Sequence, residues 1–482
     1  MMQAGKGRQA ASEKLFRAAA VVLTSLLFVF VPASHAGGGG GRKADVVSIR
    51  GGEVPSLLGV PLEKIGGYAV RDGGFKVAPR QIDERLKDGT LIYTTYRGGA
   101  TSVLDGKLAA ADEVLFMLQD AGERRDGEPL PPGAVGGVEL RVVDPLGGPE
   151  AWFYLLEFEA QAPRSDTDYV AYDPEKDWVT ARYYTVGFPY RGAIQVPSYF
   201  ACTEEAGGTG ENIYDIYKVR LTIDLKLFPT LVRSQDDFVS RPFGYVDGPV
   251  RVSRRVKTRL RMVGPIKGAL SDNDSYFYPY YCSFPSRLEI PFSMGFIAHS
   301  ASLRITDDLS GGAEGMMWYS DRNPGGVAID GKPGPEEKDI DRGPFRWKLV
   351  TGPQGTLMNL TIFDPKLEML DKKLYFCDDK SEPDGPEQFP GQIANQGFEL
   401  ANLECVPKGV YSLAVYVFCP VDYEKGDEEM YFNSVVNPLT VSATPLPRGE
   451  EISAGENDRA VSTLEGQTRF QTSTAVTGMV SD

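Results

Sequence analysis

A basic strand is the feature of this sequence best suited to bind a charged ligand. Between Val250 and Val263 apolar and polar residues alternate, a spacing that places every second side chain on the same face of a β-strand. The polar face carries Arg251, Arg255, Lys257, Arg259 and Arg261. Guanidinium and ammonium groups bind carboxylates and phosphates, so this face is a candidate site for a uronic-acid polymer or another anionic ligand. The alternative is ion pairing with neighbouring strands, which the surplus of acid in the chain favours.

Two aromatic clusters follow the basic strand. Tyrosines crowd the stretch after Asp272 and Asp274, and the second cluster begins at Trp318. Aromatic rings beside carboxylates and amides are typical of sugar sites, but the same rings also fill the core of a large sandwich, which is the more common use. The residues that we predict to bind ligand are Arg251, Arg255, Lys257, Arg259, Arg261, Tyr276, Tyr278, Tyr280, Trp318, Tyr319 and Asp321.

Histidine is nearly absent from the sequence, which excludes much enzyme chemistry. After His35 the chain has one histidine, His299, so a metal site with two histidines is excluded. The sequence contains no G-x-S-x-G elbow, no phosphate-binding loop and no C-x-x-C motif. We therefore predict no catalytic residue, no metal and no cofactor, with a carboxylate-based polysaccharide enzyme as the alternative.

The first third of the chain contains clustered carboxylates. If the strands that carry them are neighbours, Glu84, Asp112 and Asp120 could hold a cation such as calcium, or pair with Arg80 and Arg85. Solvated carboxylates at strand ends and turns are the more common arrangement. The cluster is therefore not counted among the predicted metal sites.

The N-terminal residues have the three parts of a secretory signal. Basic residues up to Arg17 precede an apolar run, residues 18–33, and Ser34-His35-Ala36 is a small-x-small cleavage site. An uncleaved anchor is the alternative, but the apolar run is short for a membrane span. We expect residues 1–36 to be removed and the protein to be exported to the periplasm, the cell surface or the medium.

Removal of residues 1–36 would leave an acidic protein with 47 Lys and Arg against 65 Asp and Glu, a net charge of −18. This charge argues against nucleic-acid binding, which needs a basic surface. The five cysteines all follow the proposed cleavage site: Cys202, Cys282, Cys377, Cys405 and Cys419. An oxidising compartment would favour one or two disulfides, and we expect Cys405 to pair with Cys419 or Cys377, although the connectivity cannot be deduced from spacing.

The chain is predicted to be all-β and mainly antiparallel, with few short helices. Strand-like alternation recurs along the sequence, above all in residues 213–227 and 250–263, and turn residues separate the segments. We divide the chain into a Gly-rich lead-in (37–43), a smaller β domain (44–160), a large antiparallel β-sandwich (161–445) and a disordered tail (446–482). One helix-like segment is expected near residues 107–113, and residues 434–444 are expected to form the last strand. The connection 229–248 is too long for a bare loop and should contain structure of its own.

Long strands in a large sandwich are similar in architecture to the mutarotase-like supersandwiches, without a matching motif. A mutarotase uses histidine as an acid, and this chain offers almost none. The sequence therefore favours an exported, non-catalytic binding or cell-envelope protein, with carbohydrate or another anionic molecule as the candidate ligand. The alternatives are the polysaccharide-active enzyme and a partner-binding subunit of a surface assembly. The last of these predicts an exposed apolar patch or strand edge.

Overall fold

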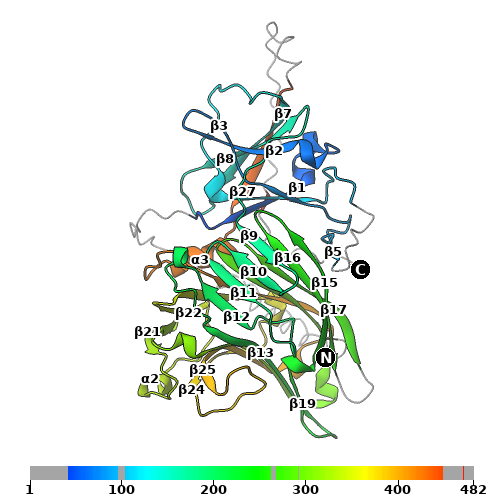
Figure 1. Cartoon of the computed structure of the whole chain (residues 1–482). Helices are drawn as coiled ribbons and strands as arrows, with labels where there is room; N and C mark the ends of the chain where they lie inside the picture. The colour runs from blue at the N-terminus through cyan, green and yellow to red at the C-terminus, as the bar shows by residue number, and fades with distance from the viewer. Residues whose placement is uncertain (1–41, 96–103, 262–266, 291–292, 449–469, 472–482) are drawn as a thin grey trace, which may run out of the picture. The chain divides into compact units, whose positions relative to one another are not determined.

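The computed structural model describes residues 42–95, 104–261, 267–290, 293–448 and 470–471. Antiparallel sheets dominate these residues, which confirms the all-β prediction, and the described α-helices are α2 (Pro335–Lys338) and α3 (Glu428–Val436) (Figure 1). By its contacts the chain divides into residues 1–41 and residues 42–482. The predicted signal, most of the Gly-rich lead-in and nearly all of the predicted tail lie outside the described residues.

Two sheets are built mainly from the first third of the chain. A three-stranded sheet has the order β1 (Val46–Arg50), β6 (Glu113–Met117), β4 (Gln81–Asp83). A six-stranded sheet has the order β28 (Phe470–Gln471), β27 (Thr440–Leu446), β7 (Ala134–Val143), β8 (Ala151–Phe158), β2 (Ile65–Arg71), β3 (Gly74–Val77). The sequence Asp72-Gly73-Gly74 predicts a hairpin turn, and the hairpin is present: β2 and β3 are joined through Asp72 and Gly73, whose φ angles of 51° and 70° match a tight hairpin turn.

Three further sheets contain most of the remaining strands. The four-stranded sheet has the order β12 (Tyr199–Cys202), β11 (Tyr184–Gly187), β10 (Trp178–Ala181), β9 (Val170–Asp173). The five-stranded sheet has the order β14 (Leu231–Ser234), β13 (Tyr214–Leu225), β19 (Ala298–Leu309), β25 (Gln392–Ala401), β24 (Asp371–Asp379). The ten-stranded sheet has the order β21 (Asn323–Ala328), β20 (Met317–Ser320), β22 (Trp347–Gly352), β23 (Gly355–Phe363), β26 (Gly409–Phe418), β18 (Tyr281–Ile290), β17 (Lys267–Phe277), β16 (Val252–Arg261), β15 (Phe238–Asp247), β5 (Thr94–Thr95).

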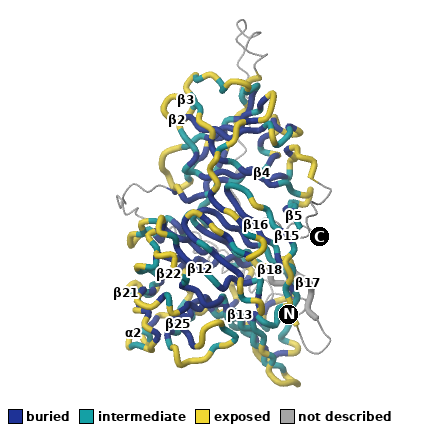
Figure 2. The backbone as a smooth tube through the Cα atoms, in the orientation of Figure 1, coloured by how far each residue is buried: buried dark blue, intermediate teal, exposed yellow. Residues whose placement is uncertain are grey.

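The two long strands that dominate the sequence lie in different sheets. β13 belongs to the five-stranded sheet and β16 to the ten-stranded sheet, and both contribute to one large apolar core, β13 through Ile223 and β16 through Val252. Figure 2 shows this burial running along the strands. The connection between them forms β14 and β15, as expected. The layers are therefore held together by apolar side chains that alternate along each strand.

Two sequence-based expectations differ from the structure, and two others hold only in part. Arg254 interrupts the alternation of the strand, which predicts a bulge or an interruption near it; β16 continues through Arg254, and the register shift lies in the partner strand, between Pro242 and Gly244 of β15. Residues 107–113 are not helical, since Leu108 exchanges backbone hydrogen bonds with the segment Gly59–Val60 instead. The expected last strand begins as α3, and β27 then pairs with β7 of the six-stranded sheet. Within the predicted tail, Phe470 and Gln471 pair with β27.

Two strands pair with sheets that are built mainly from a distant part of the sequence. β5 adds to the edge of the ten-stranded sheet beside β15, and β27 returns to the six-stranded sheet beside β7. None of the helices in the described ranges has the length and apolar character needed to cross a membrane.

Candidate functional site

A buried cluster of charges lies on the outer face of the five-stranded sheet. Tyr217, Val219 and Leu221 of β13 pack against the core, so the alternation of the strand turns Lys218 and Arg220 to the opposite face. The connection between β24 and β25, residues 380–391, covers this face and brings Asp384 and Glu387 to it. The sequence singled out β13 only as a strand. The role of its polar face is clear only when the loop 380–391, which supplies the acidic partners, is placed over it.

Lys218 is the centre of the cluster. Its side chain is 0% exposed, and its ammonium Nζ lies 2.5 Å from Asp308 Oδ2 and 2.9 Å from Glu387 Oε2. The same ammonium donates to the Asp384 carbonyl at 3.0 Å. A buried ammonium is tolerated only where acceptors replace its lost water, and this one has at least three.

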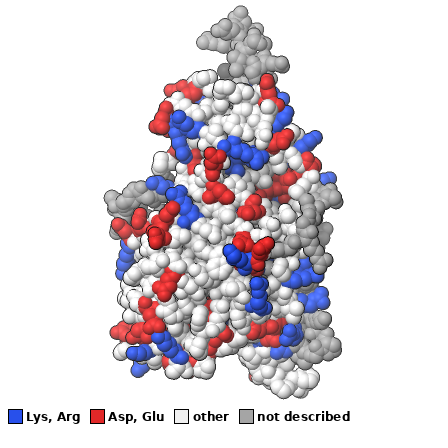
Figure 3. All heavy atoms as spheres, viewed as in Figure 1, with Lys and Arg blue, Asp and Glu red and all other residues white. Residues whose placement is uncertain are grey.

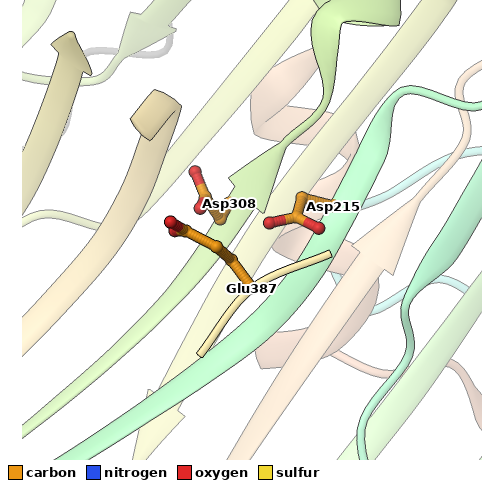
Figure 4. A group of neighbouring side chains, drawn as sticks. All are labelled: Asp215, Asp308 and Glu387. Carbon is orange, nitrogen blue, oxygen red and sulfur yellow. The ribbon is translucent and has the colours of Figure 1, made fainter. Parts of the chain in front are cut away.

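Three carboxylates of the cluster approach one another closely enough to ligate a metal ion. One oxygen each from Asp215, Asp308 and Glu387 lies within 4.8 Å of the others, and the three side chains point together in Figure 4. Asp215 Oδ1 accepts the backbone amides of Gln388 (2.9 Å) and Phe389. Because the Lys218 ammonium already contacts two of these three carboxylates, it supplies the positive charge that a metal ion would bring. The residues therefore fit an internal ion network better than a metal centre.

Two carboxyl groups of this cluster, Asp308 and Asp215, have raised pKa values. Burial raises the pKa of Asp308 to about 7, although Lys218 opposes the shift. Burial likewise raises the pKa of Asp215 to about 6, and Asp215 Oδ2 finds no hydrogen-bond donor among the described residues. Asp215 and Asp308 are 1% and 0% exposed, so a substrate could reach these carboxyl groups only if the covering loop moved. In the structure as it stands, the cluster ties residues 380–391 to the sheet.

Arg251, the first residue of the predicted basic face, is buried at the junction of two sheets. It is 2% exposed, donates to Glu113 of β6 at 2.6 Å and forms an ion pair with Asp83 of β4. Gln81 adds a second set of bonds: its Oε1 accepts the backbone amides of Val250 and Arg251 at 3.0 and 2.8 Å. These contacts join the three-stranded sheet to the ten-stranded sheet.

The other four residues of the predicted basic face are half-buried or exposed. Arg255 lies 2.6 Å from Asp274 and over the Tyr93 ring, and Lys257 lies 3.1 Å from Asp272. Arg259 is half-buried and Arg261 is exposed. Acidic and basic side chains are also interspersed over the molecular face drawn in Figure 3. For Arg251, Arg255 and Lys257 the contacts favour ion pairing, the alternative stated above; ligand binding by this strand stays a prediction.

Arg254 is the buried exception on this strand. Its guanidinium is 0% exposed, forms two bonds to Asp177 of 2.6 and 2.5 Å, and lies 3.9 Å from the centre of the Phe188 ring. A bidentate carboxylate and an aromatic face together satisfy a buried guanidinium.

The predicted aromatic residues are divided between core and surface. Trp318 is 0% exposed and donates its indole N–H to Gln396 at 2.8 Å, and Tyr276 and Tyr278 are buried around Arg251. The half-buried residues are Tyr280, Tyr319 and Asp321. Trp318 stands on β20, separated from β17 by four strands of the same sheet, and belongs to a different apolar cluster from Tyr276 and Tyr278. The contacts of Trp318, Tyr276 and Tyr278 favour core packing.

The clustered carboxylates of the first third do not converge. Asp112 accepts the backbone amides of Arg85 and Ala109, and Glu84 accepts those of residues 105 and 106. Asp120 accepts the Tyr169 hydroxyl at 2.9 Å. Each carboxylate therefore has a separate structural partner.

A partly open cleft of about 280 Å³ is a surface feature that the sequence did not reveal. It is lined by the segment before β4, by residues 163–167 and by the turn between β15 and β16, with polar side chains from Arg164, Ser165, Thr167 and Asp247. Arg80 also lines it, but its guanidinium is committed to the carbonyls of Leu62 and Ile65. Segments far apart in sequence form this cleft, so no local pattern could have predicted it.

Large apolar side chains project from one end of the five-stranded sheet. We call this group, Leu227, Phe228, Phe296 and Ile297, the apolar end; the four side chains are 88%, 72%, 82% and 45% exposed. The β13–β14 turn and the segment before β19 carry them. Lys226 joins these two segments, because its amide donates to the Ile297 carbonyl at 2.9 Å and its ammonium to the Gly295 carbonyl at 2.6 Å. The alternation over residues 213–227 predicts Leu227 on the buried face of a strand, but β13 ends at Leu225 and Leu227 stands in the turn that follows.

No protein-family model matches the chain, and no curated protein matches it. Among solved structures, the chain is similar to an alpha-mannosidase from Enterococcus faecalis V583, with a TM-score of 0.44, 10% identity, and coverage of 84% of this chain and 45% of that one. It is also similar to a protein in the glycosyl hydrolase family 38 from Enterococcus faecalis, with a TM-score of 0.44, 8% identity, and coverage of 84% and 46%. The chain thus spans less than half the length of both. A likeness of this degree assigns neither an activity nor a ligand to the chain.

Replacement of Arg251 by methionine should strongly destabilise the protein. The R251M variant keeps the volume but leaves Asp83 and Glu113 with less compensating charge, and breaking a buried pair in this way costs about 3–5 kcal/mol. Urea unfolding measures the loss, with R261M, at an exposed position of the same strand, as the control that should change stability by less than about 0.5 kcal/mol. Equal stability of the two variants would contradict the structural role of Arg251.

The raised pKa of Asp308 predicts a specific pH dependence of stability. Since the folded state binds this proton up to about pH 7 while an unfolded aspartate releases it near pH 4, the contribution of Asp308 falls as pH rises between these values. Asp308→Asn removes this titration. The difference in unfolding free energy, wild type minus D308N, should therefore decrease from pH 4 to pH 7 and level off above. A difference that is constant with pH would show that Asp308 titrates normally.

Proposed function

We propose that this chain is an exported, non-catalytic protein of the cell envelope that binds an anionic membrane surface through its apolar end. The observation that carries the proposal is the exposure of Leu227, Phe228 and Phe296, each at least 72%. Apolar side chains that stand out from two adjoining loops lose contact with water when they enter the interfacial layer of a bilayer. One alternative from the sequence, a partner-binding subunit of a surface assembly, also predicts an exposed apolar patch.

The charges near the apolar end support an anionic surface as the occupant. Lys226 is exposed beside Leu227, and Arg261, which is also exposed, is joined to β14 by a hydrogen bond from Arg233 to its carbonyl. Basic side chains near a bilayer surface are attracted to anionic headgroups, by about 1 kcal/mol each. This arrangement stands out in a chain whose net charge is −15.

Protruding side chains also distinguish a lipid surface from a protein partner. A protein interface is usually a close-packed patch that must match the shape of its partner, whereas the interfacial layer of a membrane deforms around single side chains. Exposures of 88%, 82% and 72% describe side chains that project individually. We therefore take a lipid surface as the occupant.

The alternative from the sequence, a carboxylate-based polysaccharide enzyme, needs two carboxyl groups in an open cleft, and a cleft of this kind beside Trp318 would favour it. Trp318 is buried, and the three carboxylates that approach within 4.8 Å of one another around Lys218 lie beneath the loop 380–391. The arrangement of these residues thus favours a binding protein over a glycosidase of this kind.

Vesicle co-sedimentation of the purified mature chain tests membrane binding. We expect binding to vesicles that contain phosphatidylglycerol, weaker binding to vesicles of phosphatidylcholine alone, and weakening by salt. The triple variant L227S/F228S/F296S should reduce binding by about tenfold or more, because even 1.4 kcal/mol of lost apolar burial has this effect.

The control is Leu146→Ser, which changes an apolar side chain that is 56% exposed but lies on the loop between β7 and β8. It should bind vesicles as the wild type does. All variants should unfold at the wild-type temperature, since the substituted side chains are exposed. Absence of binding to anionic vesicles, or binding that survives the triple substitution, would overturn the proposal.

A second candidate function is recognition of carbohydrate or another small anionic ligand, which the polar cleft favours. Arg164, Ser165 and Thr167 present hydrogen-bonding groups to this cleft, and such groups bind hydroxyl and carboxylate groups of sugars. The residues that line the cleft are not those predicted to bind ligand from the sequence.

A glycan array of neutral and acidic polysaccharides, read at low and high salt, tests this second candidate. Binding of an acidic glycan should be lost at least in part in R164A and unchanged in R241A, since Arg241 is exposed but does not line the cleft. Parallel R255A and R259A variants test the basic strand. If no glycan binds, both the cleft and the basic strand are excluded as glycan sites.

A further inference from the structure

We propose that Cys202 and Cys419 form a disulfide bond in this protein, linking the four-stranded sheet to the ten-stranded sheet. The physiological occurrence of this bond rests on the export proposed above, because disulfides persist in oxidising compartments. The pairing itself rests on the positions of the sulfur atoms. It differs from the pairing expected from the sequence, in which Cys405 was the partner of Cys419 or Cys377.

The two sulfur atoms are already in contact. Cys419 Sγ lies 3.1 Å from Cys202 Sγ, although the residues are 217 positions apart in the chain. A disulfide needs a separation of about 2.0 Å, so a shift of about 1 Å would close it. Cys202 ends β12 and Cys419 directly follows β26, and both side chains are 0% exposed. Two rigid elements therefore hold the thiols together.

The other hydrogen-bond partners of the two thiols among the described residues are backbone carbonyls. Cys419 Sγ lies 3.2 Å from the Tyr183 carbonyl, and Cys202 Sγ lies 3.6 Å from the Thr356 carbonyl. The adjoining backbone is closely packed, since a Cβ added to Gly355 would lie 2.5 Å from Cys202 Cβ. The site has room for a bond between the sulfurs and little room for a ligand.

The remaining cysteines are placed less favourably. Cys405 is exposed beside Glu404, and Cys377 is half-buried on β24 of the five-stranded sheet. Cys282 is buried on β18 in the same apolar core as the pair, and faces Val417 across the strands. Cys282 is therefore the competitor that an experiment has to distinguish.

The reaction is a thiol–disulfide exchange with a disulfide-bearing oxidant, either an oxidoreductase or a small-molecule disulfide. One thiolate attacks the oxidant and forms a mixed disulfide; the second thiolate then displaces the oxidant as a thiol. The two cysteines lose two protons and two electrons, and the disulfide of the oxidant is reduced to two thiols. Burial raises the pKa of Cys419 far above its ordinary value, so attack is expected before the sheets have closed over the pair.

Peptide mapping of the oxidised protein tests the proposal. The purified mature chain is unfolded with reductant and refolded in a mixture of reduced and oxidised glutathione, and its thiols are then counted in denaturant. We expect three thiols instead of five, and a non-reduced proteolytic peptide that contains Cys202 joined to Cys419. The C405S control should lose two thiols as the wild type does, whereas C202S should lose none.

Five remaining thiols in refolded wild type, or a linkage of Cys419 to Cys282, Cys377 or Cys405, would overturn the pairing. The wild-type map decides the question even if C202S fails to fold. A protein that forms the bond in this experiment but is trapped with five free thiols by alkylation in its native cells would contradict the proposed export instead.

Discussion

The ion pairs of Arg251 are the interaction on which the arrangement of the sheets depends. A guanidinium that is 2% exposed joins Asp83 of β4, Glu113 of β6 and the start of β16, and its burial limits the access of solvent that could replace these partners. Burial alone would raise the pKa of Glu113, but Arg251 and Arg85 hold it well below its usual range. These ion pairs therefore fix the start of β16, and with it the ten-stranded sheet, relative to the three-stranded sheet.

Buried charge recurs through the described residues, each time with a counter-charge on a different element. Lys348 of β22 lies 2.6 Å from Asp307 of β19, so this pair connects the ten-stranded and five-stranded sheets. Arg254 pairs with Asp177 after β9, and Lys218 pairs with Asp308 and Glu387. Apolar packing between sheets is tolerant of sliding, whereas a buried ion pair is satisfied in one position. The charges therefore specify how the layers fit, at a cost in desolvation.

Several side chains that the sequence offered for ligand binding, among them Arg251, Tyr276 and Trp318, are used internally. The apolar end and the polar cleft are described features whose groups face solvent. The apolar end consists of loops held together by Lys226, so its exposed side chains stand on a defined backbone. That combination suits attachment to a surface more than turnover of a substrate.

The pattern of apolar alternation along the chain was sufficient to predict an all-β fold, the hairpin at Asp72–Gly73 and structure in the connection between β13 and β16. These features are local: they follow from which side chains alternate and which residues favour turns. The burial of Arg251 and Trp318, the closeness of Cys202 to Cys419 and the cleft beside Arg164 are not local. Each depends on segments up to 217 residues apart, and a strand pattern reports that one face is polar without reporting what will cover it. The sequence by itself thus determined the all-β class and the exclusion of metal sites with two histidines, while the tertiary structure decided which charges became internal, because only the packing of sheets supplies their partners.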